Sequence, residues 1–201
     1  MTTSIHEERR VISGELRAVG EGDAAPTMIV GYAARFNSLS EPLQTRSGES
    51  FRERIAPGAF ANAIQTSDVR ALWNHDANIV LGRNMSGTLR LMEDENGLSY
   101  ECDPPNTQLV RDMVMAPIAR GDVNQCSFGF RVIADKWEDI AGEAIRTLTQ
   151  VDLFDVSPVT YPAYASTEVS VRSLSDVLPT QELDESYRVD LMRRKLELDT
   201  L

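Results

Sequence analysis

The chain has 201 residues, 42% of them hydrophobic and 25% charged, which is the balance of a globular protein that buries one core. Its net charge of −11 leaves no basic surface for a phosphate backbone, so nucleic acid is excluded as an expected substrate. No apolar run reaches about 18 residues, so no membrane-spanning helix is predicted. Because the polar N-terminus lacks a signal core and the two cysteines form no disulfide framework or metal cluster, we expect a reduced, cytosolic protein without a cofactor.

The first predicted strand is 28–36, a run rich in β-forming apolar residues that follows a polar arm at 1–27. The polar stretch 37–50 is typical of a surface loop. Pro57 then opens a short predicted helix, because proline is favoured at the first helical position. Alternating apolar residues return at 69–75 and predict another strand.

Residues 87–103 predict a hairpin, because the turn-forming sequence at 95–97 separates two alternating runs. The next segment, 106–121, predicts a helix whose inward face includes Leu109 and Met113, with Val110 as a further candidate. We expect Asn106 or Thr107 to cap this helix, Pro117 to distort its last turn and Gly121 to end it.

Two long β-forming runs, 123–137 and 143–162, are joined by a short connector and predict a second hairpin. A short strand is predicted at 168–172. The expected fold is α+β and mainly β, with one domain at 28–172 between the polar arm and a charged tail at 173–201. This tail can be an amphipathic helix, a partner segment or a flexible end.

One serine, Ser127, lies among alternating apolar residues in the first long run. If the hairpin turns near Ala141, opposite residues have numbers that sum to about 282, so Ser127 faces Asp155 on the same side of the sheet. Cys126 and Phe128 then point to the other side. A slip of one residue in register would place Ser127 and Asp155 on different faces.

A serine nucleophile needs a base within hydrogen-bond reach, and that base needs a third group to hold its tautomer. The chain offers two histidines, His6 in the polar arm and His75 at the end of a predicted strand. If a serine and a histidine act together, His75 is the base, and Asp155 can orient it. Asp76 is the weaker orienter, because adjacent strand residues point to opposite faces.

Each of these residues also has a purely structural interpretation. Ser127 can be an ordinary packing residue, and His75 can be a turn residue. Asp155 can cap a turn before Ser157-Pro158. Cys126 is an alternative nucleophile, although alternation places it with the phenylalanines. Residue spacing alone leaves these alternatives open.

Six motifs in chain order carry more information than any one of them. They read VGYAARFN, ERIAPGAFANAI, VRALWNHDANIVLGR, GLSYECDPP, SFGFRV and LTQVDLFDVSPVTYPAY. In this order and spacing the chain resembles the tailed-phage (caudoviral) prohead, or procapsid maturation, protease family over about residues 30–172. These proteins are serine peptidases similar in fold to the herpesvirus assemblin proteases. The resemblance therefore implies an assemblin-like antiparallel β-barrel with a few surrounding helices.

The resemblance also implies a role for three residues. His75 matches the catalytic histidine of the family, and Ser127 matches its nucleophile. The third position is less uniform, because assemblin-like enzymes use a second histidine there and this chain has none. Asp155, the acidic residue before VSPVT, is the matching candidate. The implied activity is that of an endopeptidase with a Ser–His–Asp triad.

The substrates implied by the resemblance are the scaffold protein, the N-terminal segment of the major capsid protein and the enzyme itself. The implied place is the host cytoplasm, inside the prohead of a phage or prophage, without nucleic acid, membrane or cofactor as partner. Assemblin-like proteases are active as dimers, so a homodimer is a further expectation. The arm and the tail lie outside the resemblance, and their charge and low apolar density predict assembly or packaging segments that the enzyme can trim.

Two other functions compete with this one. The first alternative is a non-catalytic capsid assembly or scaffold module with the same β fold. The second is an intracellular serine hydrolase that acts on another substrate. The presence of both His75 and Ser127 favours catalysis, because a structural module needs neither.

Overall fold

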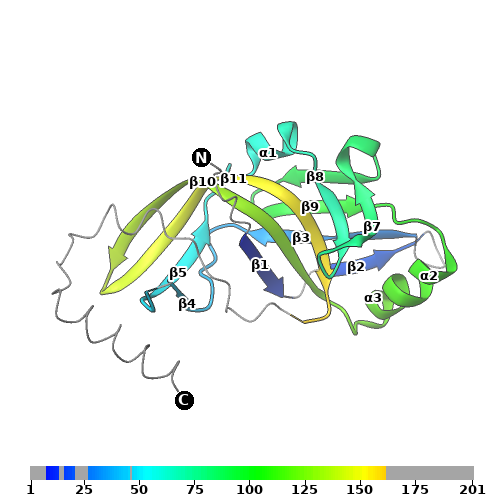
Figure 1. Cartoon of the computed structure of the whole chain (residues 1–201), viewed down its shortest axis with the longest axis horizontal. Helices are drawn as coiled ribbons and strands as arrows, with labels where there is room; N and C mark the ends of the chain where they lie inside the picture. Colours follow the sequence, from blue (N-terminus) through cyan, green and yellow to red (C-terminus); the bar gives the residue numbers. More distant parts are fainter. Residues whose placement is uncertain (1–7, 14–15, 21–26, 46, 162–201) are drawn as a thin grey trace, which may run out of the picture. The chain divides into compact units, whose positions relative to one another are not determined.

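The computed structural model describes residues 8–13, 16–20, 27–45 and 47–161. Two β-sheets and a few short helical segments make up these residues (Figure 1). The larger sheet contains β1 (Glu8–Ser13), β4 (Leu43–Gln44), β5 (Ser50–Ile55), β6 (Arg70–Trp73), β7 (Asp76–Arg83), β10 (Gln125–Ile140) and β11 (Glu143–Val159). The smaller sheet contains β2 (Leu16–Val19), β3 (Met28–Arg35), β8 (Leu89–Glu93) and β9 (Gly97–Cys102).

The helical segments are short. They are α1 (Ala61–Thr66), the 3₁₀ turn η1 (Asn84–Ser86), α2 (Gln108–Val110), the π-helical turn η2 (Arg111–Met115) and α3 (Ala116–Arg120). The expectation of a mainly β, α+β protein is therefore confirmed. The strands predicted at 28–36 and 69–75 and the hairpin predicted at 87–103 are present as β3, β6 and β8–β9.

The expected closed antiparallel barrel is not found among the strand pairs of the described residues, which form two separate sheets. The pairing is also not purely antiparallel. One half of β11 pairs in parallel with β5, and the other half pairs in parallel with β6. Because α1 follows β5 and precedes β6, the chain leaves the sheet and returns to the same edge of β11 in the same direction. This return places the end of β6 beside the C-terminal half of β11.

One hydrophobic cluster connects the two sheets. Phe128 and Phe130 of β10 are completely buried, with their rings stacked 4.9 Å apart. Phe60, just before α1, packs its ring edge-to-face against Phe128 at 5.6 Å. Leu98 and Tyr100 of β9 belong to the same buried cluster. The face of β10 that carries the phenylalanines is therefore the core face, as the alternation predicted.

The helical segment at 108–120 begins and ends as predicted. Thr107 caps it by accepting a hydrogen bond from the backbone N–H of Val110, and Gly121 ends it with a φ of 82°. Its inward face agrees with the prediction in part, because Val110 is buried and Met113 is partly buried against the core, whereas Leu109 is 65% exposed. The buried residues are Val110, Val114, Met115 and Ile118. Val110, Val114 and Ile118 are each four residues apart, so they form one buried stripe, which does not include Leu109.

The long hairpin of β10 and β11 turns at Ala141-Gly142, where both residues have positive φ angles of 56° and 84°. Such angles are typical of a two-residue type I′ turn, whose twist matches that of the paired strands. The turn predicted near Ala141 is confirmed. Figure 1 shows this hairpin as a pair of long ribbons to which other strands of the larger sheet attach.

The register of this hairpin differs from the predicted one. The turn is centred between Ala141 and Gly142, which shifts the pairing by one residue, and the irregularities along the pair shift it by one more, so that Ser127 lies opposite Ser157 and Asp155 opposite Gly129. The predicted direct pairing of Ser127 with Asp155 is therefore wrong by two residues. Because two is the period of a strand, the side chains of Ser127 and Asp155 still point to the same face.

Two strands lie before residue 28, where the sequence predicted a polar arm. β1 pairs with β10 in the larger sheet, and β2 pairs with β3 in the smaller sheet. The strand predicted at 168–172 and the tail at 173–201 lie outside the described residues.

Candidate active site

The tight turn between β6 and β7 consists of Asn74 and His75, whose φ angles are 53° and 59°. A left-handed backbone conformation is unfavourable for residues other than glycine, and among those residues asparagine adopts it most readily. Three hydrogen bonds hold the turn to the end of β11. The N–H of Asn74 donates to the carbonyl oxygen of Pro158 at 3.0 Å. The amide side chain of Asn74 accepts from the N–H of Thr160 at 2.8 Å and donates to the Thr160 hydroxyl at 3.2 Å.

The three residues singled out from the sequence meet at this turn. Nε2 of His75 lies 2.6 Å from Oγ of Ser127, and Nδ1 of His75 lies 2.6 Å from Oδ1 of Asp155. Ser127 comes from β10, Asp155 from β11 and His75 from the β6–β7 turn. Ser127 is completely buried, and the side chains of His75 and Asp155 are 7% and 6% exposed. The three groups therefore form one continuous, shielded chain of hydrogen bonds.

The partners fix the hydrogen-bonding state of the imidazole. An ionised carboxylate can only accept, so Nδ1 of His75 donates to Asp155. The lone pair of Nε2 then faces the hydroxyl of Ser127, which donates to it. This arrangement allows the imidazole to take the proton from the serine oxygen as that oxygen attacks a carbonyl carbon.

Ser157 is a fourth member of this group that the sequence did not reveal. Its hydroxyl donates to Oδ1 of Asp155 at 2.5 Å, and the residue is completely buried. The same carboxylate oxygen therefore accepts from both His75 and Ser157. Asp155 lies inside β11, so the alternative that it caps a turn before Ser157-Pro158 is wrong. The alternating pattern Asp-Val-Ser is the signal that could have identified Ser157.

Asp76, the weaker orienter by sequence, makes different contacts. Its Oδ1 accepts hydrogen bonds from the backbone N–H and the side-chain amide of Asn78, both at 2.8 Å. These bonds stabilise the start of β7. Asp155 is the carboxylate that hydrogen-bonds to His75.

Cys126 lies on the core face of β10, where its Sγ contacts the hydroxyl of Tyr100 at 3.5 Å. Burial raises the pKa of the Cys126 thiol to about 12. The thiolate is the nucleophilic form of cysteine, and it forms only as the pH approaches that value. The chemistry of this position therefore disfavours Cys126 as a nucleophile, in agreement with the alternation of the strand.

This burial predicts that thiol alkylation spares the folded protein. Iodoacetamide at pH 8 is expected to leave Cys126 unmodified, because a thiol with a raised pKa stays protonated well below it. The same reagent is expected to modify the unfolded chain completely. Intact-mass spectrometry of native and denatured samples measures the difference. Rapid alkylation of native Cys126 would contradict this account.

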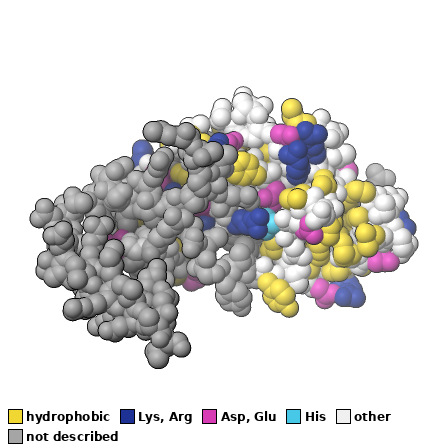
Figure 2. Space-filling view, viewed as in Figure 1, with side chains coloured by type: hydrophobic (Ala, Val, Ile, Leu, Met, Phe, Trp, Pro, Cys, Tyr) yellow, Lys and Arg dark blue, Asp and Glu magenta, His cyan; other side chains and the backbone are white. Residues whose placement is uncertain are grey.

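Figure 2 shows one face of the molecule, on which hydrophobic side chains gather together with acidic and basic ones. The side chain of His75 is 7% exposed, whereas Ser127 is completely buried. Of these two residues, His75 is therefore the one in contact with solvent. A separate hollow of about 750 Å³ lies over the smaller sheet, and its lining includes Tyr32, Arg90 and Met92 but none of the three residues that meet at the turn.

Two further features of the described residues concern metals and membranes. No group of three or more histidine, cysteine, aspartate or glutamate side chains is arranged there to hold a metal ion. Within the same ranges, no helix has both the length and the apolar character needed to cross a bilayer.

The comparisons with known proteins agree with the chemistry of the site. Residues 14–180 match the family model described as caudovirus prohead serine protease. No curated protein and no solved structure matches the chain. The matched stretch contains His75, Ser127 and Asp155, and it covers most of the chain.

Proposed function

The chain belongs to the caudovirus prohead serine protease family, and on that premise we propose that it cleaves the scaffold protein, the N-terminal segment of the major capsid protein, or both, inside the assembling prohead. Membership makes the chain a serine peptidase of phage capsid maturation with capsid-related protein substrates. The particular substrates, the cleavage of its own ends and a homodimeric active form are parts of the proposal. So is an assemblin-like arrangement of the domain at 28–172.

The observation that carries this proposal is the hydrogen-bonded chain from Ser127 through His75 to Asp155. We infer that Ser127 is the nucleophile, His75 the general base and Asp155 the residue that orients the imidazole. A serine hydroxyl is a weak nucleophile, and a base at hydrogen-bond distance is what activates it. Burial of the three side chains strengthens the support, because electrostatic interactions act more strongly where water is excluded.

In the proposed mechanism, Oγ of Ser127 attacks the scissile carbonyl carbon while Nε2 of His75 accepts the hydroxyl proton. The imidazolium is stabilised by the carboxylate of Asp155. His75 returns the proton to the leaving amine, the peptide C–N bond breaks and an acyl-enzyme ester remains. Water then attacks the ester with the same proton transfers, and the shortened chain leaves as a free carboxylate.

Co-expression with the cognate capsid and scaffold proteins tests the proposal. Wild-type enzyme is expected to shorten at least one of these chains, as measured by intact-mass spectrometry. A fluorophosphonate probe is expected to leave an adduct on the peptide that contains Ser127. The non-catalytic alternative predicts full-length capsid chains and no adduct. An adduct on another residue would transfer the nucleophile's role away from Ser127.

A second prediction concerns Asp155, the carboxylate that hydrogen-bonds to His75, and its neighbour Ser157. Asp155→Asn is expected to slow cleavage by about 10² to 10⁴, less than loss of the nucleophile, because the amide favours the wrong imidazole tautomer. Ser157→Ala is expected to cost about 10-fold, since it removes one hydrogen bond to a charged acceptor. Ser157→Thr retains the hydroxyl and is the matched control. An unchanged rate in Asp155→Asn would assign the orienting role to another residue.

A further inference from the structure

The strand that carries Ser127 has two edges, and a segment from the start of the chain occupies one of them. β11 pairs with one edge of β10, and β1 pairs antiparallel with the other. In the β1 register, Val11 lies opposite Ser127, and Arg10 lies opposite Phe128. The six residues of β1 cover the backbone of β10 from Gln125 to Phe130. The nucleophile therefore lies in the middle of an edge that is already paired.

Such an edge has the chemistry of a peptide-binding site. An extended peptide can add to a sheet edge through main-chain hydrogen bonds, while side-chain contacts give specificity. Because β11 holds one edge of β10, the edge beside β1 is the place where an extended peptide can pair next to Ser127. Ser127 is also completely buried in this arrangement, so a peptide carbonyl cannot contact its Oγ. Access to the serine requires a rearrangement near this strand.

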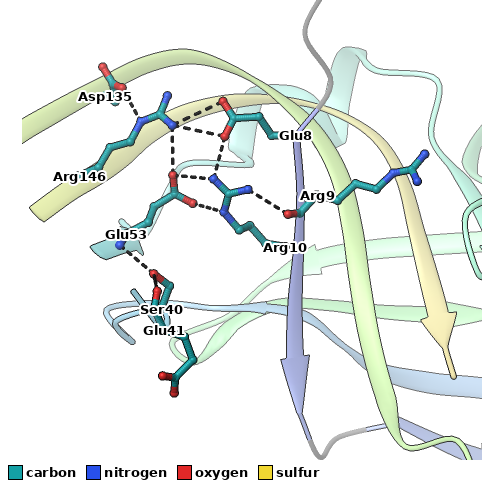
Figure 3. A network of polar contacts seen from close by, with 8 residues as sticks. All are labelled: Glu8, Arg9, Arg10, Ser40, Glu41, Glu53, Asp135 and Arg146. Atoms are coloured by element: carbon teal, nitrogen blue, oxygen red, sulfur yellow. Dashed lines mark hydrogen bonds and ion pairs between the residues drawn. The ribbon is translucent and has the colours of Figure 1, made fainter. Parts of the chain in front are cut away.

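Two side chains of β1 fix its register through the buried ionic cluster in Figure 3. Arg10 donates from Nε to Oε1 of Glu53 at 2.7 Å and from Nη2 to Glu8 at 2.7 Å. Arg146 lies 3.3 Å from carboxylate oxygens of both Glu8 and Glu53, and its Nε donates to Asp135 at 2.7 Å. Burial acts to lower the pKa of Arg10, but Glu53 and Glu8 outweigh it, and the pKa lies above its usual value.

The cluster has a removable half and a fixed half. Glu8 and Arg10 come from β1, which precedes the stretch that matches the family model. Glu53, Asp135 and Arg146 come from β5, β10 and β11, inside that stretch. If β1 leaves, Arg146 still pairs with Glu53 and Asp135. The matched domain then presents a carboxylate and a guanidinium beside the free edge, ready for another segment with the same charges.

We propose that the β10 edge beside Ser127 is the substrate-docking edge of this protease, and that β1 occupies it in cis as an internal competitor. The proposal rests on the proposed function. The substrate segment is an extended peptide with an acidic residue followed two positions later by an arginine. These two side chains take the places of Glu8 and Arg10 against Arg146 and Glu53.

The proposal predicts that releasing β1 exposes a peptide-binding site. In the full-length chain, Arg10→Glu places a carboxylate beside Glu53 and Glu8, and this repulsion is expected to release β1 while Glu53 keeps Arg146. A fluorescein-labelled peptide of residues 7–14, EERRVISG, is then expected to bind the variant at least 10-fold more tightly than it binds wild type. Fluorescence anisotropy measures the binding.

Matched controls separate docking from a general charge effect. Arg120→Glu makes the same charge change at an exposed side chain and is expected to bind the peptide like wild type. The same peptide with Arg10→Glu is expected not to bind the released variant. Hydrogen exchange at residues 125–130 reports whether β1 has left, and thermal unfolding reports whether the domain remains folded. Arg9→Pro, which removes a backbone N–H from β1, is a second releasing variant.

Two results would overturn the docking edge. Exchange at 125–130 that stays slow in both Arg10→Glu and Arg9→Pro would make β1 a permanent strand of the sheet. Fast exchange without peptide binding would mean that the exposed edge does not accept a peptide.

A catalytic measurement separates this proposal from the proposed function. Arg10→Glu is expected to lower the KM for the capsid substrate by about 10-fold with kcat nearly unchanged, because an internal competitor has been removed. If wild type and Arg10→Glu both cleave the capsid substrate with equal KM values, the docking-edge proposal is wrong and the proposed protease function stands. If a variant with released β1 binds the peptide but cleaves no capsid protein and forms no fluorophosphonate adduct, the docking-edge proposal stands and the proposed protease function is wrong.

Discussion

Ser127→Ala is expected to abolish capsid processing, with a fall in rate on the order of 10⁴ or more. The substitution removes the oxygen that lies 2.6 Å from Nε2 of His75 and leaves the rest of β10 unchanged. Because alanine fits where a completely buried serine stood, the fold is expected to be retained. Co-expression with the capsid protein, followed by intact-mass analysis over time, measures the rate.

The comparison variants make this result specific. His75→Ala is expected to lose as much activity as Ser127→Ala, and the double variant is expected to lose no more, because the two residues act as one unit. Ser99→Ala is the control, since Ser99 is a serine of β9 that donates to the carbonyl oxygen of Met92. It is expected to change the rate less than about twofold. A Ser127→Ala enzyme that cleaves at the normal rate would end the assignment.

The sequence predicted most of the elements near the site because their signals are local. The apolar run at 28–36, the turn at 95–97 and the turn near Ala141 each depend on a few neighbouring residues. The scarcity of histidines made His75 the candidate base. The hairpin register was not predictable in this way. Its irregularities, such as the one between Gly129 and Phe130, depend on how the long strands bend against other parts of the sheets.

The residues that the sequence missed have partners far away in the chain. β1 lies in the segment predicted to be a polar arm, but Arg10 contacts Glu53, 43 residues away, and Glu8 contacts Arg146, 138 residues away. No local pattern distinguishes a charge in solvent from one paired inside the protein. Ser157 was missed for a different reason, because the proline that follows it suggested a turn and not a buried strand.

Arg146→Ala is expected to destabilise the protein by roughly 3–5 kcal/mol, the usual cost of breaking a buried ion pair from one side. Arg146 is 3% exposed and contacts three carboxylates, those of Glu8, Glu53 and Asp135. With Arg10 as the second cation, the cluster already holds more carboxylates than guanidinium groups. Removing Arg146 increases this excess at a position from which water is largely excluded. Chemical denaturation of the purified protein measures the free energy of unfolding.

Arg54→Ala is the matched control, because Arg54 pairs with Glu138 in a solvent-exposed bridge and is expected to cost less than about 1 kcal/mol. Arg10→Ala is expected to cost less than Arg146→Ala, because β1 can detach and carry Glu8 into water. The other members of the cluster lie on strands inside the sheet and cannot move into water in this way; they are Glu53 of β5, Asp135 of β10 and Arg146 of β11. Equal losses in the Arg10 and Arg146 variants would mean that β1 is as fixed as the rest of the sheet, which the docking-edge proposal does not allow.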